Sequence, residues 1–141
     1  MYKFLVPFLL SLSLCAVAAD TQIVKSHVGN CAVMVPSDWS VTGAFGIAKS
    51  PDKKLLVAVT TPKSLGSIAE VKQMAPSIYK DDKVTKDSDS EFEMAGTGMG
   101  GKPNIYRAIP AGSGVCIAEV NYEEGTEAVA KQVIETLKAV K

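Results

Sequence analysis

Residues 31–41 read CAVMVPSDWSV, and this stretch decides how the fold begins. Cys31, Val33 and Val35 fall on one side of a pattern with period two, which predicts a β-strand. Pro36 has no backbone N–H to donate, so it ends that strand. The Ser-Asp pair that follows is typical of a turn, after which the chain resumes an extended segment.

Further strands are predicted downstream of this turn. The run at 55–59 is apolar throughout, which is typical of a central strand covered on both faces. The run at 91–94 alternates between acidic and apolar residues, so one face of that strand is expected to be exposed to solvent. The expected strands after the turn are 45–48, 55–59, 91–94, 105–109 and 115–122.

Two helices are predicted among these strands. Ser67 and Glu70 form a capping box that begins the first helix, and Pro76 is expected to kink or end that helix near Ala75. The charged run 80–89 is expected to be a solvated loop.

The second helix is expected over 126–140. Its apolar stripe is Val129, Val133, Leu137 and Val140. The order of strands, helix, strands and helix, with hairpin-length links, predicts an α+β fold. In it, helices pack on an antiparallel sheet.

The first nineteen residues have the layout of a secretory signal peptide. A positive start and an apolar run lead to small residues, with cleavage expected before Ala19 or Asp20. The apolar run is shorter than the roughly 20 residues that a membrane span needs. A lipid anchor on Cys15 is the alternative. Residues 20–141 are then expected to form one periplasmic or secreted domain.

The composition fits one globular domain. Hydrophobic residues make up 47% of the chain and charged residues 21%, which argues against wholesale disorder. Residues 20–141 contain 14 basic and 15 acidic residues, a net charge of −1. That balance gives no general attraction to nucleic acid or to anionic lipid.

Cys31 and Cys116 are the two cysteines outside the signal segment. In an oxidising compartment an even number of cysteines indicates a disulfide. Two buried free thiols are the alternative. Two distant cysteines and the single His27 do not make a dense ligand set, so neither a metal nor a cofactor is expected.

Three catalytic or ligand-binding motifs are incomplete. The segment 96–102, GTGMGGK, resembles a nucleotide loop, but Pro103 replaces the required Ser or Thr and no helix follows. Residues 87–91 begin like a calcium loop, but Phe92 stands where glycine is required. A single histidine, His27, and no nucleophile elbow leave no hydrolase triad. We therefore expect no catalytic residues.

The same glycine-rich segment is the candidate partner-binding site. Met99 offers an adaptable apolar contact, and Lys102 offers a steering charge. Four glycines in seven residues raise the entropic cost of ordering the segment. The alternative is that the glycines supply positive φ angles for a long turn and that Met99 folds back onto the sheet.

From Val35 to Val41 the chain resembles the Mog1/PsbP-like family, which opens its domain with an apolar strand, a Pro-x-x-Trp turn and another strand. The order of elements agrees in outline from Cys31 to Lys141. The resemblance implies an α-β-α sandwich around an antiparallel sheet. Members include a Ran-binding nuclear factor, a photosystem II subunit and bacterial envelope proteins, and the signal peptide favours the last group.

The resemblance implies little about chemistry, because such domains bind protein partners or have no known role. We therefore expect a small periplasmic or secreted, non-catalytic binding module that engages a protein partner in the cell envelope. The alternative is a carrier of a small ligand or metal ion, and the third possibility is a cryptic hydrolase. We expect neither nucleic-acid binding nor a membrane span.

Overall fold

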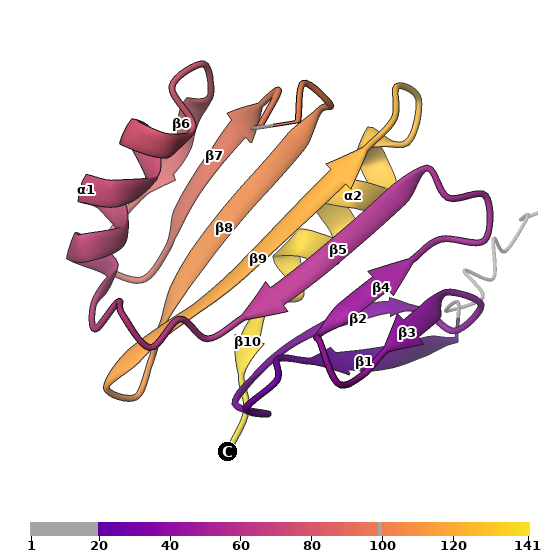
Figure 1. Cartoon of the computed structure of the whole chain (residues 1–141), viewed down its shortest axis with the longest axis horizontal. Coiled ribbons are helices and arrows are strands. Elements are labelled where there is room, and N and C mark those ends of the chain that lie inside the picture. Colours follow the sequence, from indigo (N-terminus) through magenta and orange to yellow (C-terminus); the bar gives the residue numbers. More distant parts are fainter. Residues whose placement is uncertain (1–19, 99) are drawn as a thin grey trace, which may run out of the picture.

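The computed structural model describes residues 20–98 and 100–141 and contains ten strands and two helices (Figure 1). The helices are α1 (Ile68–Ile78) and α2 (Glu127–Glu135). The strands are β1 (Thr21–Lys25), β2 (Cys31–Pro36), β3 (Ser40–Thr42), β4 (Ile47–Lys49), β5 (Leu55–Thr60), β6 (Lys83–Asp87), β7 (Phe92–Gly96), β8 (Asn104–Ala111), β9 (Gly114–Tyr122) and β10 (Lys138–Ala139).

The strands form two antiparallel sheets. The larger sheet has the order β3-β4-β5-β9-β8-β7-β6, and the smaller has the order β1-β2-β10. The long β8–β9 hairpin lies within the larger sheet, and its register runs from Asn104 opposite Asn121 to Ala111 opposite Gly114. Antiparallel pairing follows from the short links between consecutive strands, since parallel strands need long crossovers.

One face of the larger sheet is covered by α2 and by the smaller sheet. Figure 1 shows α2 behind β5 and β9. Alternate residues of β5 and β9 point to this side and meet apolar residues of β2 and α2. This core contains buried residues of β2, β5, β9 and α2 and one residue after α2. They are Cys31, Val33, Val35, Leu55, Val57, Val59, Cys116, Ala118, Val120, Ala130, Val133, Ile134 and Leu137.

The other face of the sheet is covered in part by α1, which Figure 1 shows at the β6–β7 end of the sheet. Val71, Ala75 and Tyr79 face a second apolar cluster on this side. Their partners on the sheet are Phe92, Met94, Tyr106, Ala108, Val115 and Ile117. Helices on opposite faces make the predicted α-β-α arrangement, and the α+β fold class is confirmed.

The first helix begins where the capping box predicts. The Ser67 hydroxyl accepts a hydrogen bond from the Glu70 amide (3.3 Å). The Glu70 carboxylate accepts one from the amide of Gly66 (2.9 Å), one residue earlier than in a standard capping box. The first bond satisfies an amide that the first turn of a helix leaves without a partner, and the second holds the residue that precedes the cap.

A disulfide joins the two sheets. Cys31 on β2 and Cys116 on β9 are bonded, with their Cα atoms 5.5 Å apart, and both residues are fully buried. The bond crosses the core between the smaller and the larger sheet. It is the pairing that the cysteine count predicts, and the alternative of two free thiols does not describe this structure.

The first helix ends at Ile78, two residues after Pro76 and three after the boundary predicted near Ala75. Pro76 lies in the last turn, where little helix remains to be disrupted. The Ser77 hydroxyl donates to the Met74 carbonyl (2.6 Å), and the Tyr79 amide donates to the Ala75 carbonyl (2.9 Å).

The second helix is shorter than predicted. It ends at Glu135, because the Thr136 hydroxyl donates to the Val133 carbonyl (2.6 Å) and accepts from the Met34 amide (2.7 Å). These bonds turn the chain toward β2, and β10 adds to the edge of that strand. Val129 belongs to the predicted apolar stripe but is 36% exposed.

Two predictions about strands also need correction. The charged run 80–89 contains a strand, β6, which pairs with β7 at the edge of the larger sheet. The central strand β5 is covered on one face only, because Leu56 and Ala58 on its other face are half-buried. This half-open face is where the candidate site lies.

The predicted signal peptide lies outside the described residues, as do its cleavage site and Cys15. Within residues 20–98 and 100–141, neither helix is long and apolar enough to cross a membrane.

Candidate functional site

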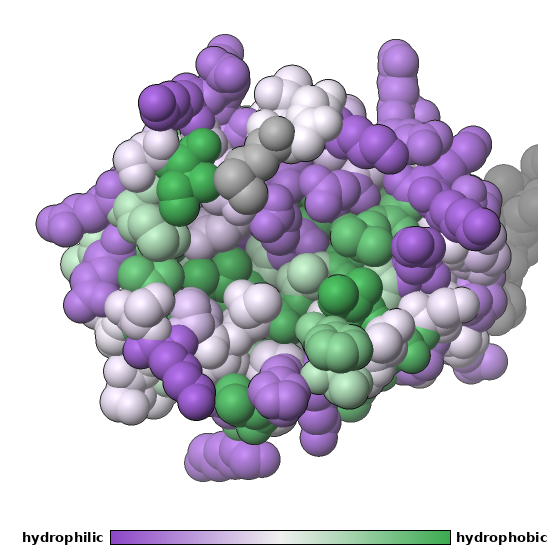
Figure 2. All heavy atoms as spheres, viewed as in Figure 1, coloured by the Kyte–Doolittle hydropathy of each residue, from purple (hydrophilic) through white to green (hydrophobic). Residues whose placement is uncertain are grey.

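The candidate site lies on the part of the sheet that α1 leaves uncovered. On this side of β4 and β5, Ile47, Leu56 and Ala58 are half-buried rather than covered by a helix. Figure 2 shows this face: apolar residues reach the surface across its middle, and hydrophilic residues surround them. An apolar surface with a polar rim is typical of an interaction site.

A hollow of about 480 Å³ opens at one end of this face. Leu56 on β5 and Glu119 and Asn121 on β9 lie at its bottom, so its floor is the sheet itself. Its rim comes from the end of β4, the turn between β4 and β5, and the hairpin loop between β7 and β8. The residues that line the hollow are Lys49, Lys53, Leu56, Gly100, Lys102, Glu119 and Asn121.

Three lysines give the hollow a positive rim. Lys49 ends β4, Lys53 lies in the β4–β5 turn, and Lys102 lies in the β7–β8 loop; all three are exposed. None of them forms an ion pair with a carboxylate in the described part of the chain. Glu119 is the one acidic residue in the lining, so positive charge predominates.

A polar cluster lies under the hollow. The Tyr79 hydroxyl donates to Glu119 Oε2 (3.0 Å), and Asn104 Nδ2 donates to Glu119 Oε1. The same Asn104 amide donates to Asn121 Oδ1 (2.9 Å). Both carboxylate oxygens of Glu119 are therefore hydrogen-bonded within the fold, and the side chain is held in place on the floor of the hollow.

Two tyrosines of the α1-side apolar cluster lie beside this polar cluster. The rings of Tyr79 and Tyr106 lie 5.2 Å apart at a tilt of 46°. Burial raises the pKa of both phenols, and the negative charge of Glu119 raises the pKa of each further. Tyr79 therefore remains a hydrogen-bond donor to the carboxylate well above neutral pH.

The hairpin loop is packed against the fold by its glycines. A Cβ atom on Gly96 would lie 2.8 Å from the Cα of Asp82, and one on Gly98 would lie 2.9 Å from the Cβ of Asn104. Gly98 and Gly101 have φ angles of 59° and 71°, which disfavour other residues. The Gly98 amide also donates to Asp82 Oδ1 (3.0 Å).

These contacts support the turn interpretation of the glycines. Glycine is needed at 96 and 98 for close packing, so its presence there does not indicate a binding role. Of the two residues proposed to contact a partner, Lys102 lies on the rim of the hollow. Met99 lies outside the described residues.

The sequence analysis did not identify Lys49, Lys53, Glu119 or Asn121 as site residues. A usable signal was present for the last two. Asn104, Glu119 and Asn121 are polar residues in mostly apolar strands, and a buried polar group such as the Asn104 amide needs hydrogen-bond partners. No comparable signal distinguishes the two lysines from others, because only the topology brings them to one rim.

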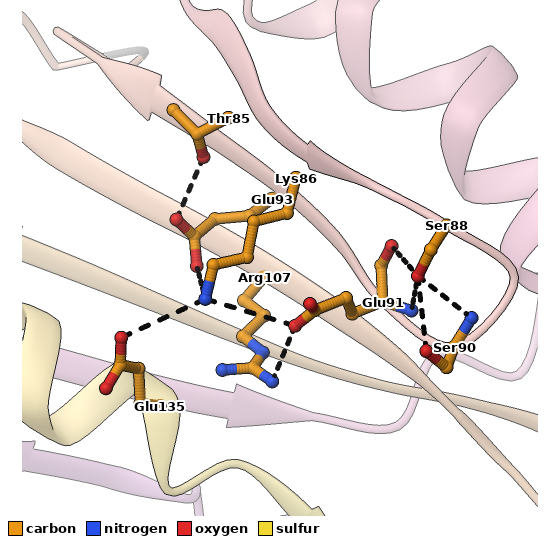
Figure 3. Close-up of polar contacts among 8 residues, drawn as sticks. All are labelled: Thr85, Lys86, Ser88, Ser90, Glu91, Glu93, Arg107 and Glu135. Carbon is orange, nitrogen blue, oxygen red and sulfur yellow. Dashed lines mark hydrogen bonds and ion pairs between the residues drawn. The ribbon is translucent and has the colours of Figure 1, made fainter.

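A second polar cluster lies on the opposite face of the sheet (Figure 3). Lys86 Nζ lies 3.7 Å from Glu93, 3.9 Å from Glu135 and 4.0 Å from Glu91. Arg107 Nη2 binds Glu91 at 2.9 Å. The cluster links β6, β7 and β8 to the end of α2, and two cations lie among its three carboxylates. We interpret it as structural.

The remaining candidate, His27, lies in the turn after β1. Its Nδ1 donates to the carbonyl of Ala44 (2.9 Å), and the residue is exposed. Among the described residues, no three or more histidine, cysteine or acidic side chains are arranged to hold a metal ion.

Comparison with known proteins identifies the fold. No family model matches the chain, and no curated protein matches its sequence. Among solved structures, the chain is similar to the solution structure of cyanobacterial PsbP (CyanoP) from Synechocystis sp. PCC 6803. The TM-score is 0.51 at 10% sequence identity, over 92% of this chain and 99% of that one. The chain therefore has a PsbP-like fold.

Proposed function

We propose that this chain is a small non-catalytic binding module that engages a protein partner in the cell envelope. The observation that carries the proposal is the uncovered half of the α1-side face. On this face, an apolar strip formed by Ile47, Leu56 and Ala58 adjoins the hollow with the lysine rim. The half-buried apolar residues of this face belong to neither core cluster, and apolar surface rimmed by polar residues marks interaction sites.

The chemistry of the site favours binding over catalysis. Glu119 is the acidic group in the hollow, and both of its oxygens already accept hydrogen bonds from Tyr79 and Asn104. A general base must instead be available to a substrate proton. Tyr79 and Tyr106 are poor acids, because burial raises the pKa of each phenol.

The compartment is part of the proposal. The layout of residues 1–19 is that of a secretory signal, so the working chain would begin at Ala19 or Asp20. The buried disulfide between Cys31 and Cys116 supports an oxidising compartment, since such bonds persist outside the cytosol.

Transport of a small ligand is the second candidate function. The volume of the hollow favours it, because about 480 Å³ falls within the range of small-molecule sites. Native mass spectrometry of protein purified from its own host tests this candidate. A co-purified ligand that is lost on replacing Leu56 with glutamate supports it.

Photo-cross-linking from the candidate face tests the main proposal. A photoreactive amino acid replaces Leu56 in the hollow, and a matched control replaces Ala128, an exposed residue of α2 behind the sheet. We expect one protein to be cross-linked from position 56 in cells and not from position 128. Failure to cross-link a protein from position 56, or an identical pattern from both positions, would reject the proposal.

A further inference from the structure

We infer that the partner docks an acidic segment into the hollow, with carboxylates at the lysine rim and an apolar side chain over Leu56. The inference rests on the proposed function and names the chemistry of its partner. Three features of the described residues carry it: the free lysines of the rim, the backbone conformation of Lys53, and the apolar floor.

The lysines of the rim have no competing acid within the described fold. Glu119 is held by Tyr79 and Asn104. Asp52, the neighbour of Lys53, accepts hydrogen bonds from the Ser50 hydroxyl (2.7 Å) and the Lys54 amide (3.1 Å). These two hydrogen bonds lower the pKa of Asp52, and the bond from the Ser50 hydroxyl has the larger effect. The Asp52 carboxylate is therefore already hydrogen-bonded within its own turn. The rim lysines therefore remain available to an outside anion.

Lys53 has an unfavourable backbone conformation for a lysine. Its φ of 61° makes it the one non-glycine residue with a positive φ in the described chain. Glycine or asparagine would adopt this turn conformation more readily than lysine. Unfavourable backbone at a surface turn is frequently associated with function, and here it places an ammonium group at the rim of the hollow.

The apolar floor of the hollow indicates that the partner also contributes an apolar side chain. Exposed ion pairs contribute little affinity, because solvent and salt screen them. Leu56 lies within the lysine rim and is half-buried, so an apolar side chain seated on it would remove further apolar surface from water. A segment with both acidic and apolar residues fits this surface better than a simple anion.

The test uses two labelled peptides and the chain expressed from residue 20. One peptide has the sequence Gly-Glu-Glu-Leu-Glu-Glu-Gly, and in the other glutamine replaces each glutamate. We expect the acidic peptide to bind at least about tenfold more tightly than the glutamine peptide, and to weaken as salt is raised. NMR shifts on binding should centre on Lys49, Lys53, Leu56 and Lys102.

Matched triple variants locate the binding. Replacing Lys49, Lys53 and Lys102 with glutamine should weaken binding of the acidic peptide by about tenfold. Replacing three exposed lysines elsewhere removes the same charge and should change binding by less than about twofold. These control positions are Lys25, Lys63 and Lys138.

Three outcomes would overturn the inference: equal binding of the two peptides, equal loss in the two triple variants, or equally effective competition by free glutamate or inorganic phosphate. The last outcome would make the hollow a general anion site. The cross-link from Leu56 separates this failure from failure of the proposed function. If the partner still cross-links in the Lys49, Lys53 and Lys102 variant, the function stands and the acidic segment is wrong.

Discussion

At the scale of single residues, Glu119 determines whether the lysines around the hollow can bind an outside anion. It lies among three lysines, yet its oxygens are engaged by Tyr79 and Asn104 beneath the surface. The carboxylate therefore holds the tyrosine and the asparagine together and leaves the lysines available. Neighbouring elements of the fold supply both partners, so the sheet and α1 fix this arrangement.

The Tyr79–Glu119 hydrogen bond predicts a stability change at high pH. Burial and the Glu119 charge raise the pKa of Tyr79 above its ordinary value of about 10. A raised pKa in the folded state means that the stabilisation is complete below about pH 10 and is lost as pH rises further. We expect the urea midpoint of unfolding to fall above pH 10.

The Tyr79→Phe variant is the control for this prediction. It lacks the titrating hydroxyl, so its urea midpoint should fall less steeply above pH 10, because Tyr106 and Tyr122 still titrate. Near neutral pH the variant should lose about 1 kcal/mol of unfolding free energy with the hydrogen bond. Parallel curves for both proteins between pH 8 and 11 would contradict the account.

The glycines of the hairpin loop predict an unequal response to alanine. Gly98 has a positive φ, and a Cβ there would meet Asn104 at 2.9 Å, whereas a Cβ on Gly100 meets no atom within 4 Å. Gly98→Ala should cost about 1–3 kcal/mol of unfolding free energy. Gly100→Ala should be neutral or slightly stabilising. Equal effects in chemical denaturation would show that the loop is not packed as described.

At the scale of elements, the sequence predicts best where apolar residues alternate. The strands around Val33, Val57 and Val120 are correctly placed, because one face of each is buried. The edge strand β6 is not predicted, because its residues are mostly charged and exposed and show no apolar alternation. Only its pairing with β7 makes this segment a strand. Its lysines and the irregular register near Val84 suit an exposed edge, which must resist further pairing.

The end of α2 could not be predicted from periodicity, because tertiary contacts decide it. The apolar spacing continues past Glu135, but the Thr136 hydroxyl binds the amide of Met34, more than a hundred positions earlier in the chain. Local patterns contain no information on that contact. The same limit applies to the candidate site, where topology brings Lys49, Lys53 and Lys102 together.

The role of Thr136 can be tested directly. Thr136→Ala removes the hydrogen bonds of the hydroxyl and leaves the Met34 amide without this partner, so we expect a loss of about 1–2 kcal/mol in unfolding free energy. Thr136→Ser keeps the hydroxyl and should retain most of this stability. The idea fails if serine and alanine destabilise the fold equally in urea unfolding.

At the scale of the whole molecule, the disulfide joins two sheets that also meet through apolar contacts. Cys31 and Cys116 are 85 residues apart in sequence, so the bond closes a long loop in the unfolded chain. The chain-entropy account gives a stabilisation of about 4.5 kcal/mol for such a loop.

The double variant Cys31→Ala, Cys116→Ala should therefore unfold at a much lower urea concentration than the oxidised protein. The reduced wild-type chain is the matched control and should resemble the variant, since it lacks the same cross-link. An oxidised protein no more stable than its reduced form would contradict this role for the bond.

The central claim is that the uncovered half of the α1-side face binds a protein partner. Amide hydrogen exchange of the chain, alone and in complex with the partner identified by cross-linking, tests it most directly. We predict slower exchange on binding at residues 47–58, 97–98 and 100–104, which lie around the hollow, and unchanged exchange in α2. Slowing confined to α2 or to the β6 edge, with none around the hollow, would contradict the claim.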